Sequence, residues 1–222
     1  MKLKDIKAVI FDLDNTILDR RKTFRRFSES LIATYFNHMD ETDRLIDRII
    51  ELDQDGYKEK TAMFSELLDE FPWKRKPELN ELMAYYQQHY VQNATLMDQA
   101  REVIQHLKLK YKLGLITNGK TVIQYGKIDQ LGIRDEFEAI LVSEEAGIKK
   151  PDPKIFEMAV EKLKVKPEDC VYIGDHPKND IEGAGNAGMK TIWMKVNQPW
   201  TPELKMTPLY EITQLRELLG IL

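Results

Sequence analysis

The chain has 222 residues, 42% of them hydrophobic and 32% charged, with a formal net charge of −4. This composition is typical of a globular protein with a sizeable core, and the slightly acidic balance argues against a nucleic-acid polymer as partner. The single cysteine, Cys170, excludes an internal disulfide and a multi-cysteine metal site. No stretch approaches the ~20 apolar residues of a membrane span, and the charged first residues do not resemble a signal peptide, so we expect a cytoplasmic protein without a membrane partner.

The first predicted element is a strand at Ala8–Phe11, the first of five short apolar runs. Each run is nearly continuous rather than alternating, a pattern typical of strands buried on both faces of a parallel sheet. Helical patterns separate the last four runs, so the sequence predicts an α/β fold: a Rossmann-like parallel sheet core with helices on both faces. The other four runs are Leu113–Ile116, Ala139–Val142, Cys170–Ile173 and Thr191–Met194.

The stretch between the first two strands has a helical pattern throughout. Its apolar stripes predict four helices of ~12–18 residues that bury their faces against one another as a small bundle. We therefore expect an all-helical domain at residues 18–94, inserted into an α/β core formed by residues 1–17 and 95–222. The basic run that begins at Arg20 leaves two interpretations open, a solvated helix face or an entrance that attracts an anionic substrate.

Helices are also expected in the core. One begins at Pro153, with Asp152 as its N-cap. Another carries an apolar stripe that we expect to face the sheet, and a last one should dock on the core at the end of the chain. The stripe consists of Val122, Tyr125, Ile128 and Leu131, and the terminal helix carries Leu215, Leu218 and Leu219.

Polar residues that can carry chemistry follow the predicted strands, where an open parallel sheet binds its ligands. Asp12 and Asp14 follow the first strand, and Thr117 follows the second. Converging carboxylates repel one another unless a cation joins them, and oxygen ligands beside a phosphate favour Mg²⁺. One aspartate can attack phosphorus and a second can transfer protons, while a hydroxyl and an ammonium hold the phosphoryl oxygens. The remaining residues of this set are Thr16, Asn118, Gly119, Lys150, Asp175 and Asp180.

These residues resemble the four signature segments of the haloacid dehalogenase superfamily of hydrolases, in the family's order and over most of the chain outside the helical insertion. The Asp-x-Asp-x-Thr segment is residues 12–16, and the second segment is Thr117. The third is Lys150 in Lys-Pro-Asp-Pro, and the fourth, Gly-Asp-x-x-x-x-Asp, is residues 174–180. The helical insertion resembles the C1 cap of this superfamily, which closes over the pocket and carries substrate specificity.

The resemblance implies a role for each acidic position. Asp12 would be the nucleophile and a Mg²⁺ ligand. Asp14 would be the general acid/base, with its main-chain carbonyl on Mg²⁺. Asp175 would be the remaining protein ligand of the metal. Asp180 would hold metal-bound water or orient Lys150, and so belongs to the surroundings of the metal site.

The resemblance also implies how phosphate is held. Thr117 and Lys150 would bind the phosphoryl oxygens. Lys149 competes with Lys150 for the role of the cation, and because the family places its lysine directly before the proline, Lys150 is favoured. Further substrate contacts are implied for Asn118, Gly119 and Thr16, the last of which is equally suited to stabilising the turn.

The predicted function is that of a Mg²⁺-dependent phosphatase that hydrolyses a small phosphorylated metabolite through an aspartyl-phosphate. A 2-haloacid dehalogenase is disfavoured by Asp14, because dehalogenation needs no acid for an alkoxide leaving group. A phosphomutase would share all of these residues, and a non-catalytic binding protein would have no need of so many converging charges. Tyr57 and Lys60 of the insertion are candidate substrate contacts, and His176 is a weaker candidate for proton transfer. The sequence makes no prediction of the oligomeric state.

Overall fold

The computed structural model describes residues 3–222, which divide into two compact units. One unit combines the chain up to Asp19 with Leu96–Leu222, and the other is the intervening segment Arg20–Thr95. The predicted boundaries, after residues 17 and 94, lie beside the observed ones. Within the described residues, no helix is both long and apolar enough to span a membrane.

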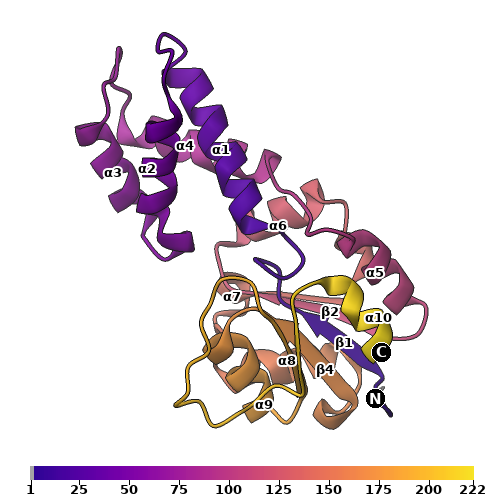
Figure 1. The fold of residues 1–222 in the computed structure, drawn as a ribbon. Helices are drawn as coiled ribbons and strands as arrows, with labels where there is room; N and C mark the ends of the chain where they lie inside the picture. Colours follow the sequence, from indigo (N-terminus) through magenta and orange to yellow (C-terminus); the bar gives the residue numbers. More distant parts are fainter. Residues whose placement is uncertain (1–2) are drawn as a thin grey trace. The chain divides into compact units, whose positions relative to one another are not determined.

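The first unit is built on one parallel sheet, in which Figure 1 labels β1, β2 and β4. Its strand order is β3-β2-β1-β4-β5-β6. β1 lies in its middle, where Val9 is opposite Leu113 of β2 and Val171 of β4. All five predicted strands are present. The sixth was not predicted, because its three residues alternate in polarity and form no apolar run. The strands are β1 (Ala8–Phe11), β2 (Lys112–Thr117), β3 (Ala139–Val142), β4 (Cys170–Gly174), β5 (Lys190–Met194) and β6 (Tyr210–Ile212).

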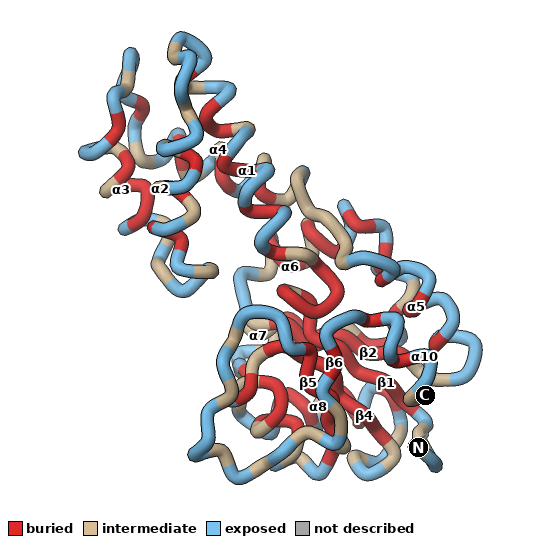
Figure 2. Tube along the Cα trace, viewed as in Figure 1, coloured by how far each residue is buried: buried red, intermediate tan, exposed pale blue. Residues whose placement is uncertain are grey.

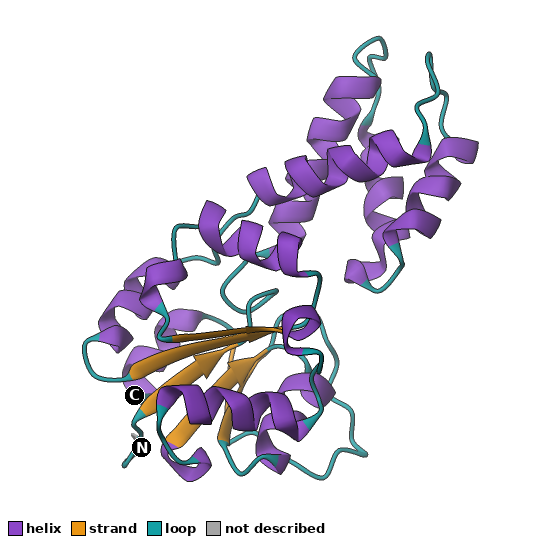
Figure 3. Cartoon of the chain, turned by 180° about the vertical axis from the view of Figure 1, so that it is seen from behind, coloured by secondary structure: helices purple, strands orange, loops and turns teal. Residues whose placement is uncertain are grey.

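Helices cover both faces of this sheet (Figure 3), as the sequence predicts. Because side chains alternate along a strand, Ala8 and Ile10 of β1 point to one face and join a buried cluster with α8. α8 begins as predicted, since a side-chain oxygen of Asp152 accepts a hydrogen bond of 3.0 Å from the main-chain N–H of Lys154. The α-helices of this unit are α5 (Ala100–Lys108), α6 (Thr121–Gln130), α7 (Ser143–Ala146), α8 (Pro153–Leu163), α9 (Gly183–Asn186) and α10 (Leu218–Ile221).

The orientation of α6 agrees with the prediction only in part. Ile128 and Leu131 of the predicted stripe are buried, but Val122 is 65% exposed. The buried face of the helix also includes Ile123, Gln124 and Lys127. Two of these side chains are polar, so the apolar periodicity indicated a face that is rotated from the real one. The terminal helix differs in a smaller way, because Leu215 and Leu218 are buried as predicted while Leu219 is exposed.

The second unit is a helical bundle, as predicted, with apolar stripes buried between its helices (Figure 2). Aromatic side chains fill its interior. The rings of Phe27 and Tyr86, for example, meet edge to face with their centroids 5.4 Å apart. The four helices are α1 (Arg20–Tyr35), α2 (Asp43–Asp53), α3 (Lys60–Glu70) and α4 (Leu79–Gln92).

The basic run at the start of α1 is not uniformly a solvated face. Arg20 is buried, and its guanidinium lies 2.6 Å from a carboxylate oxygen of Asp53 and 3.2 Å from one of Asp55. The ammonium of Lys60 lies 2.8 Å from the other oxygen of Asp53. Arg20 and Lys60 thus serve as the cations of a buried ion-pair cluster inside the bundle.

Candidate active site

Three sequence-predicted residues meet at the carboxyl edge of the sheet because their strands are neighbours. Asp12 directly follows β1, Thr117 ends β2, and Asp175 directly follows β4. In the strand order β2-β1-β4, the parallel register brings these three strand ends side by side. Asp12 and Thr117 are almost fully buried, and Asp175 is buried as well.

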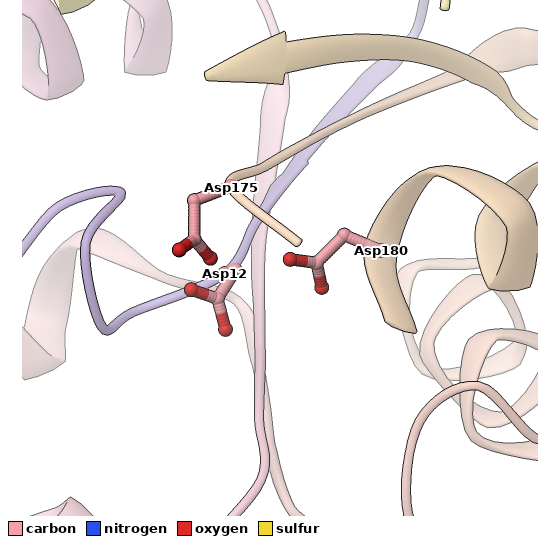
Figure 4. Close-up of side chains that lie close together, drawn as sticks. All are labelled: Asp12, Asp175 and Asp180. Atoms are coloured by element: carbon pink, nitrogen blue, oxygen red, sulfur yellow. The ribbon is translucent and has the colours of Figure 1, made fainter. Parts of the chain in front are cut away.

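Asp12, Asp175 and Asp180 form a compact acidic cluster (Figure 4). Each offers a carboxylate oxygen that lies within 4.8 Å of the others. All three residues are buried. The structure thus brings together Asp12 and Asp175, the two predicted metal ligands with side-chain oxygens, and Asp180, the predicted residue beside the metal.

The cation beside this cluster is Lys150. Its ammonium lies 2.6 Å from Oδ1 of Asp12 and 2.7 Å from Oδ1 of Asp180. It also donates to the hydroxyl of Tyr172 at 3.0 Å and to the carbonyl of Ile116 at 3.0 Å. Lys149 is exposed. Lys150, which the family pattern favours over Lys149, is therefore the lysine that contacts the acidic cluster.

Asn118 holds the backbone of Lys150 in place. The side-chain amide of Asn118 donates to the Lys150 carbonyl at 3.0 Å, and its oxygen accepts from the Lys150 N–H at 2.9 Å. This reciprocal pair joins the segment after β2 to the segment before α8. Asn118 was predicted to contact substrate, and the structure shows a side chain whose hydrogen bonds go to Lys150.

The charges of the cluster do not balance. Burial disfavours a charged ammonium, but the carboxylates of Asp12 and Asp180 outweigh burial and hold the pKa of Lys150 well above its ordinary value. Burial raises the pKa of Asp12 to about 7 against the opposing effect of Lys150. Burial, with Asp12 and Asp180 as neighbours, also raises the pKa of Asp175 well above its ordinary value.

Three buried carboxylates face one ammonium, and this excess of negative charge fits a divalent cation. The donor atoms are all carboxylate oxygens, which hard cations such as Mg²⁺ prefer. A bound cation would stabilise the ionised carboxylates that burial otherwise disfavours. The residues present therefore fit a metal ion, which the carboxylates of Asp12, Asp175 and Asp180 could hold.

Gly174 allows Asp180 to approach the cluster. A side chain at position 174 would place its Cβ 2.5 Å from Cβ of Asp180, which no real pair of such atoms tolerates. Asp180 lies in a short π-helix, Pro177–Glu182, and its second oxygen accepts from the His176 N–H at 2.9 Å. The glycine of the Gly-Asp segment is therefore required by packing at the site.

The ring of His176, a weaker candidate for proton transfer, has a structural contact. Its Nδ1 accepts hydrogen bonds from the main-chain N–H groups of Lys178 and Asn179, at 3.2 and 3.3 Å, and so caps the π-helix. Burial lowers its pKa, which favours the neutral ring that this acceptor role requires.

Asp14 has a cation of its own. The ammonium of Lys127, from α6, lies 2.8 Å from Oδ1 and 3.0 Å from Oδ2 of Asp14. The amide of Gln124 donates to Oδ2 of Asp14 at 2.9 Å and also to the hydroxyl of Thr117. Gln124 in turn accepts from Lys127 at 2.8 Å. A polar network thus joins the residue predicted as general acid/base to a residue predicted to bind phosphate.

Two other predicted substrate contacts have different surroundings. The N–H of Gly119 donates to the Ser143 hydroxyl at 3.0 Å, and at its φ of +150° a Cβ would lie 3.0 Å from the Gln124 side chain. Thr16 is fully buried, and within the described residues its hydroxyl has no hydrogen-bond partner. Its main-chain N–H bonds to the carbonyl of Leu13 at 3.3 Å, which favours the turn-stabilising interpretation.

Four residues at the site were not predicted. Tyr172 lies within an apolar run that was predicted as a buried strand, and Gln124 and Lys127 lie outside the apolar stripe predicted for their helix. The side chain of Asn15 donates a hydrogen bond to Asp175. The position of Asn15 between Asp14 and Thr16 was the one local signal. For Tyr172, Gln124 and Lys127, the site could have been inferred only from a correct prediction of the side of the strand or helix on which each side chain lies.

A family model described as haloacid dehalogenase-like hydrolase matches residues 9–194 of this chain. The chain belongs to this family. The predicted family and fold class are therefore confirmed. The acidic cluster, Lys150 and Thr117 occupy the positions of the signature segments that the sequence showed.

Two curated proteins and one solved structure are similar to this haloacid dehalogenase-like hydrolase over nearly its whole length. Glyceraldehyde 3-phosphate phosphatase of Pyrococcus furiosus is 30% identical over 226 residues, covering 99% of this chain and 94% of that protein. N-acylneuraminate-9-phosphatase of Homo sapiens is 27% identical over 237 residues, covering 100% and 96%. The HAD-hydrolase YfnB of Bacillus subtilis, bound to magnesium, has a TM-score of 0.81 at 27% identity and covers 97% of each chain.

Proposed function

We propose that this chain is a Mg²⁺-dependent phosphatase that hydrolyses a small phosphate monoester through an aspartyl-phosphate on Asp12. Phosphate-monoester hydrolysis, predicted from the sequence, is confirmed at the level of enzyme class by the curated relatives, which are phosphatases. The observation that carries the mechanism is the pairing of Asp12 with Lys150 inside a cluster of three buried carboxylates. Such a cluster is what a cation-assisted attack on a phosphate anion requires.

In the first half of the reaction, a carboxylate oxygen of Asp12 attacks phosphorus and the bond to the alcohol oxygen breaks. The carboxyl of Asp14 gives its proton to that leaving oxygen. In the second half, Asp14 takes a proton from water as the water attacks the aspartyl-phosphate. Inorganic phosphate leaves, Asp12 is restored as a carboxylate, and Asp14 again carries its proton.

Lys150 and Thr117 are proposed to bind the phosphoryl oxygens and stabilise the charge of the transition state. Mg²⁺ would be held by Asp12, Asp175 and the main-chain carbonyl of Asp14, and when bound it neutralises charge on the attacking carboxylate and the phosphoryl group. Asp180 orients Lys150, since its Oδ1 lies 2.7 Å from the ammonium.

The proposed substrate is a small phosphorylated carbohydrate. Glyceraldehyde 3-phosphate and N-acylneuraminate 9-phosphate, named for the curated relatives, both belong to that class. The helical unit Arg20–Thr95 is the proposed C1-type cap and the source of substrate selectivity. Within it, Tyr57 is 62% exposed and stays a candidate contact. Lys60 is a weaker candidate, because its ammonium is paired with Asp53.

A hydrolytic assay tests this proposal. We expect release of inorganic phosphate from para-nitrophenyl phosphate, loss of activity in EDTA and its return with added Mg²⁺. Asp12→Asn should abolish turnover while the circular dichroism spectrum stays that of a folded protein. Activity that survives complete chelation would remove the metal from the mechanism. Turnover in Asp12→Asn would exclude the aspartyl-phosphate, and transfer of phosphate to a sugar without its release would indicate a phosphomutase.

A further inference from the structure

The carboxylate of Asp14 is held by two side chains of α6 that the signature segments do not include. The Lys127 ammonium spans both of its oxygens, at 2.8 and 3.0 Å, and Gln124 donates to one of them at 2.9 Å. Lys127 and Gln124 are almost fully buried, whereas 23% of the Asp14 side chain is exposed. The two buried side chains of Lys127 and Gln124 therefore hold the Asp14 side chain, which is partly open to solvent.

The contacts that hold Asp14 in this place act against repulsion between its carboxylate and that of Asp12. Asp12 lies two residues away, and two carboxylates so close together repel each other when both are ionised. Lys150 is engaged with Asp12 and Asp180. The second buried lysine, Lys127, supplies the positive charge on the side of Asp14 and keeps its carboxylate near the strand ends.

Gln124 connects the Asp14–Lys127 ion pair to the proposed phosphate site. Its amide nitrogen donates to both Asp14 and the hydroxyl of Thr117, and its amide oxygen accepts from Lys127. Gly119 leaves the space for this side chain, since a Cβ there would lie 3.0 Å from Gln124. The amide group of Gln124 thereby sets the distance between the Asp14 carboxyl, the proposed acid/base, and the Thr117 hydroxyl, which is proposed to bind phosphate.

We propose that Lys127 and Gln124 are positioning residues that hold the Asp14 carboxyl where the leaving-group oxygen departs. This inference rests on the proposed phosphatase function. Rigid placement of a proton donor is worth a large factor in rate, because a misplacement of about 1 Å can lower turnover on the order of 100-fold. The two residues act through Asp14, so their loss should matter most where the leaving group needs a proton.

The test compares two aryl esters that differ only in a para-nitro group, para-nitrophenyl phosphate and phenyl phosphate. The nitrophenolate leaves readily without a proton, whereas phenolate is a poorer leaving group. We expect Lys127→Met to lower kcat/KM for phenyl phosphate about tenfold more than for the nitrophenyl ester. Asp14→Asn should show the same selectivity, and the double variant should lose little beyond Asp14→Asn alone, because the residues act as one unit.

Gln124→Met provides a second route to the same result and should shift the ratio of the two kcat/KM values in the same direction. Lys162→Met, which removes an exposed lysine of α8, is the matched control and should change neither value. An equal loss on both esters through a raised KM would overturn the inference and make Lys127 a phosphate-binding residue. Additive losses in the double variant would also overturn the inference. If the wild-type protein hydrolyses neither ester, the proposed function fails, and this inference fails with it.

Discussion

The ammonium of Lys150 lies 2.6 Å from Oδ1 of Asp12, and both side chains are buried. The same ammonium lies 2.7 Å from Asp180, so one cation serves two carboxylates. A buried ion pair contributes little net stability as a pair, but removal of one partner leaves the other charges uncompensated. This asymmetry makes Lys150 a residue on which the folded state depends.

Lys150→Met should destabilise the metal-free protein by roughly 3–5 kcal/mol, because Asp12, Asp175 and Asp180 then lack a buried cation. Phosphatase activity should fall at least about 100-fold, since the proposed donor to the phosphoryl oxygens is lost. Urea unfolding in EDTA and steady-state kinetics measure the two effects. Lys149→Met is the matched control, because that lysine is exposed and should leave both values near wild type. Equal effects of the two substitutions would contradict the assignment of Lys150.

Gly174→Ala should displace Asp180, because the new Cβ would lie 2.5 Å from Cβ of Asp180. We expect a loss of about 1–3 kcal/mol in stability from this overpacking. We also expect lower kcat, because Asp180 no longer orients Lys150. Gly220→Ala, in a terminal helix with open space around the added methyl, should be neutral or slightly stabilising. Thermal unfolding with an activity assay compares the two, and a fully active Gly174→Ala would show that the position of Asp180 is not critical.

The affinity for Mg²⁺ should depend on pH through Asp12. Its pKa in the metal-free protein is about 7. Below that pH a metal ion must displace a proton from the carboxyl. The apparent affinity should therefore fall by up to about tenfold per pH unit below pH 7 through Asp12, and Asp175, whose pKa is also raised, should add to this fall. Isothermal titration calorimetry at pH 6, 7 and 8 measures this change, and an affinity independent of pH would argue against Asp12 as a ligand.

The same shift affects the stability of the metal-free protein. The unfolded chain loses the Asp12 proton near the ordinary pKa of 3.8, whereas the folded protein keeps it up to about 7. Because the folded state binds more protons in this window, its stability should fall as pH rises from about 4 to about 7. The raised pKa of Asp175 acts in the same direction. Asp12→Asn should flatten this part of the profile, as measured by urea unfolding in EDTA.

Asp53→Ala should destabilise the helical unit. Asp53 lies 2.6 Å from the guanidinium of Arg20 and 2.8 Å from the ammonium of Lys60, and it is almost fully buried. Its removal leaves a buried guanidinium with less compensation, which we expect to cost about 3 kcal/mol. Asp47→Ala, which removes an exposed carboxylate 3.7 Å from Arg25, should change stability by less than about 0.5 kcal/mol. Unfolding by urea, followed by far-ultraviolet circular dichroism, separates the two outcomes.

The strands and the residues at their ends could be predicted because the relevant signals are local. A strand buried on both faces is a continuous apolar run, and β1 to β5 each have one. The chemistry of a parallel sheet lies at its carboxyl edge, so the residue after such a run is a candidate without knowledge of the fold. Asp12, Thr117 and Asp175 were found in this way. β6 was missed because an edge strand of three residues carries no such run.

The amino-acid sequence by itself determined the α/β core, the helical insertion and the signature residues, because apolar periodicity and motif spacing are properties of neighbouring residues. Only the tertiary structure decided that Lys127 and Gln124 face Asp14. These two side chains lie more than a hundred positions from Asp14 along the chain, on a helix whose buried face is partly polar. It also decided that Lys150, and not Lys149, compensates the acids. Long-range pairing of buried charges follows from the packing of strands and helices, which no local pattern specifies.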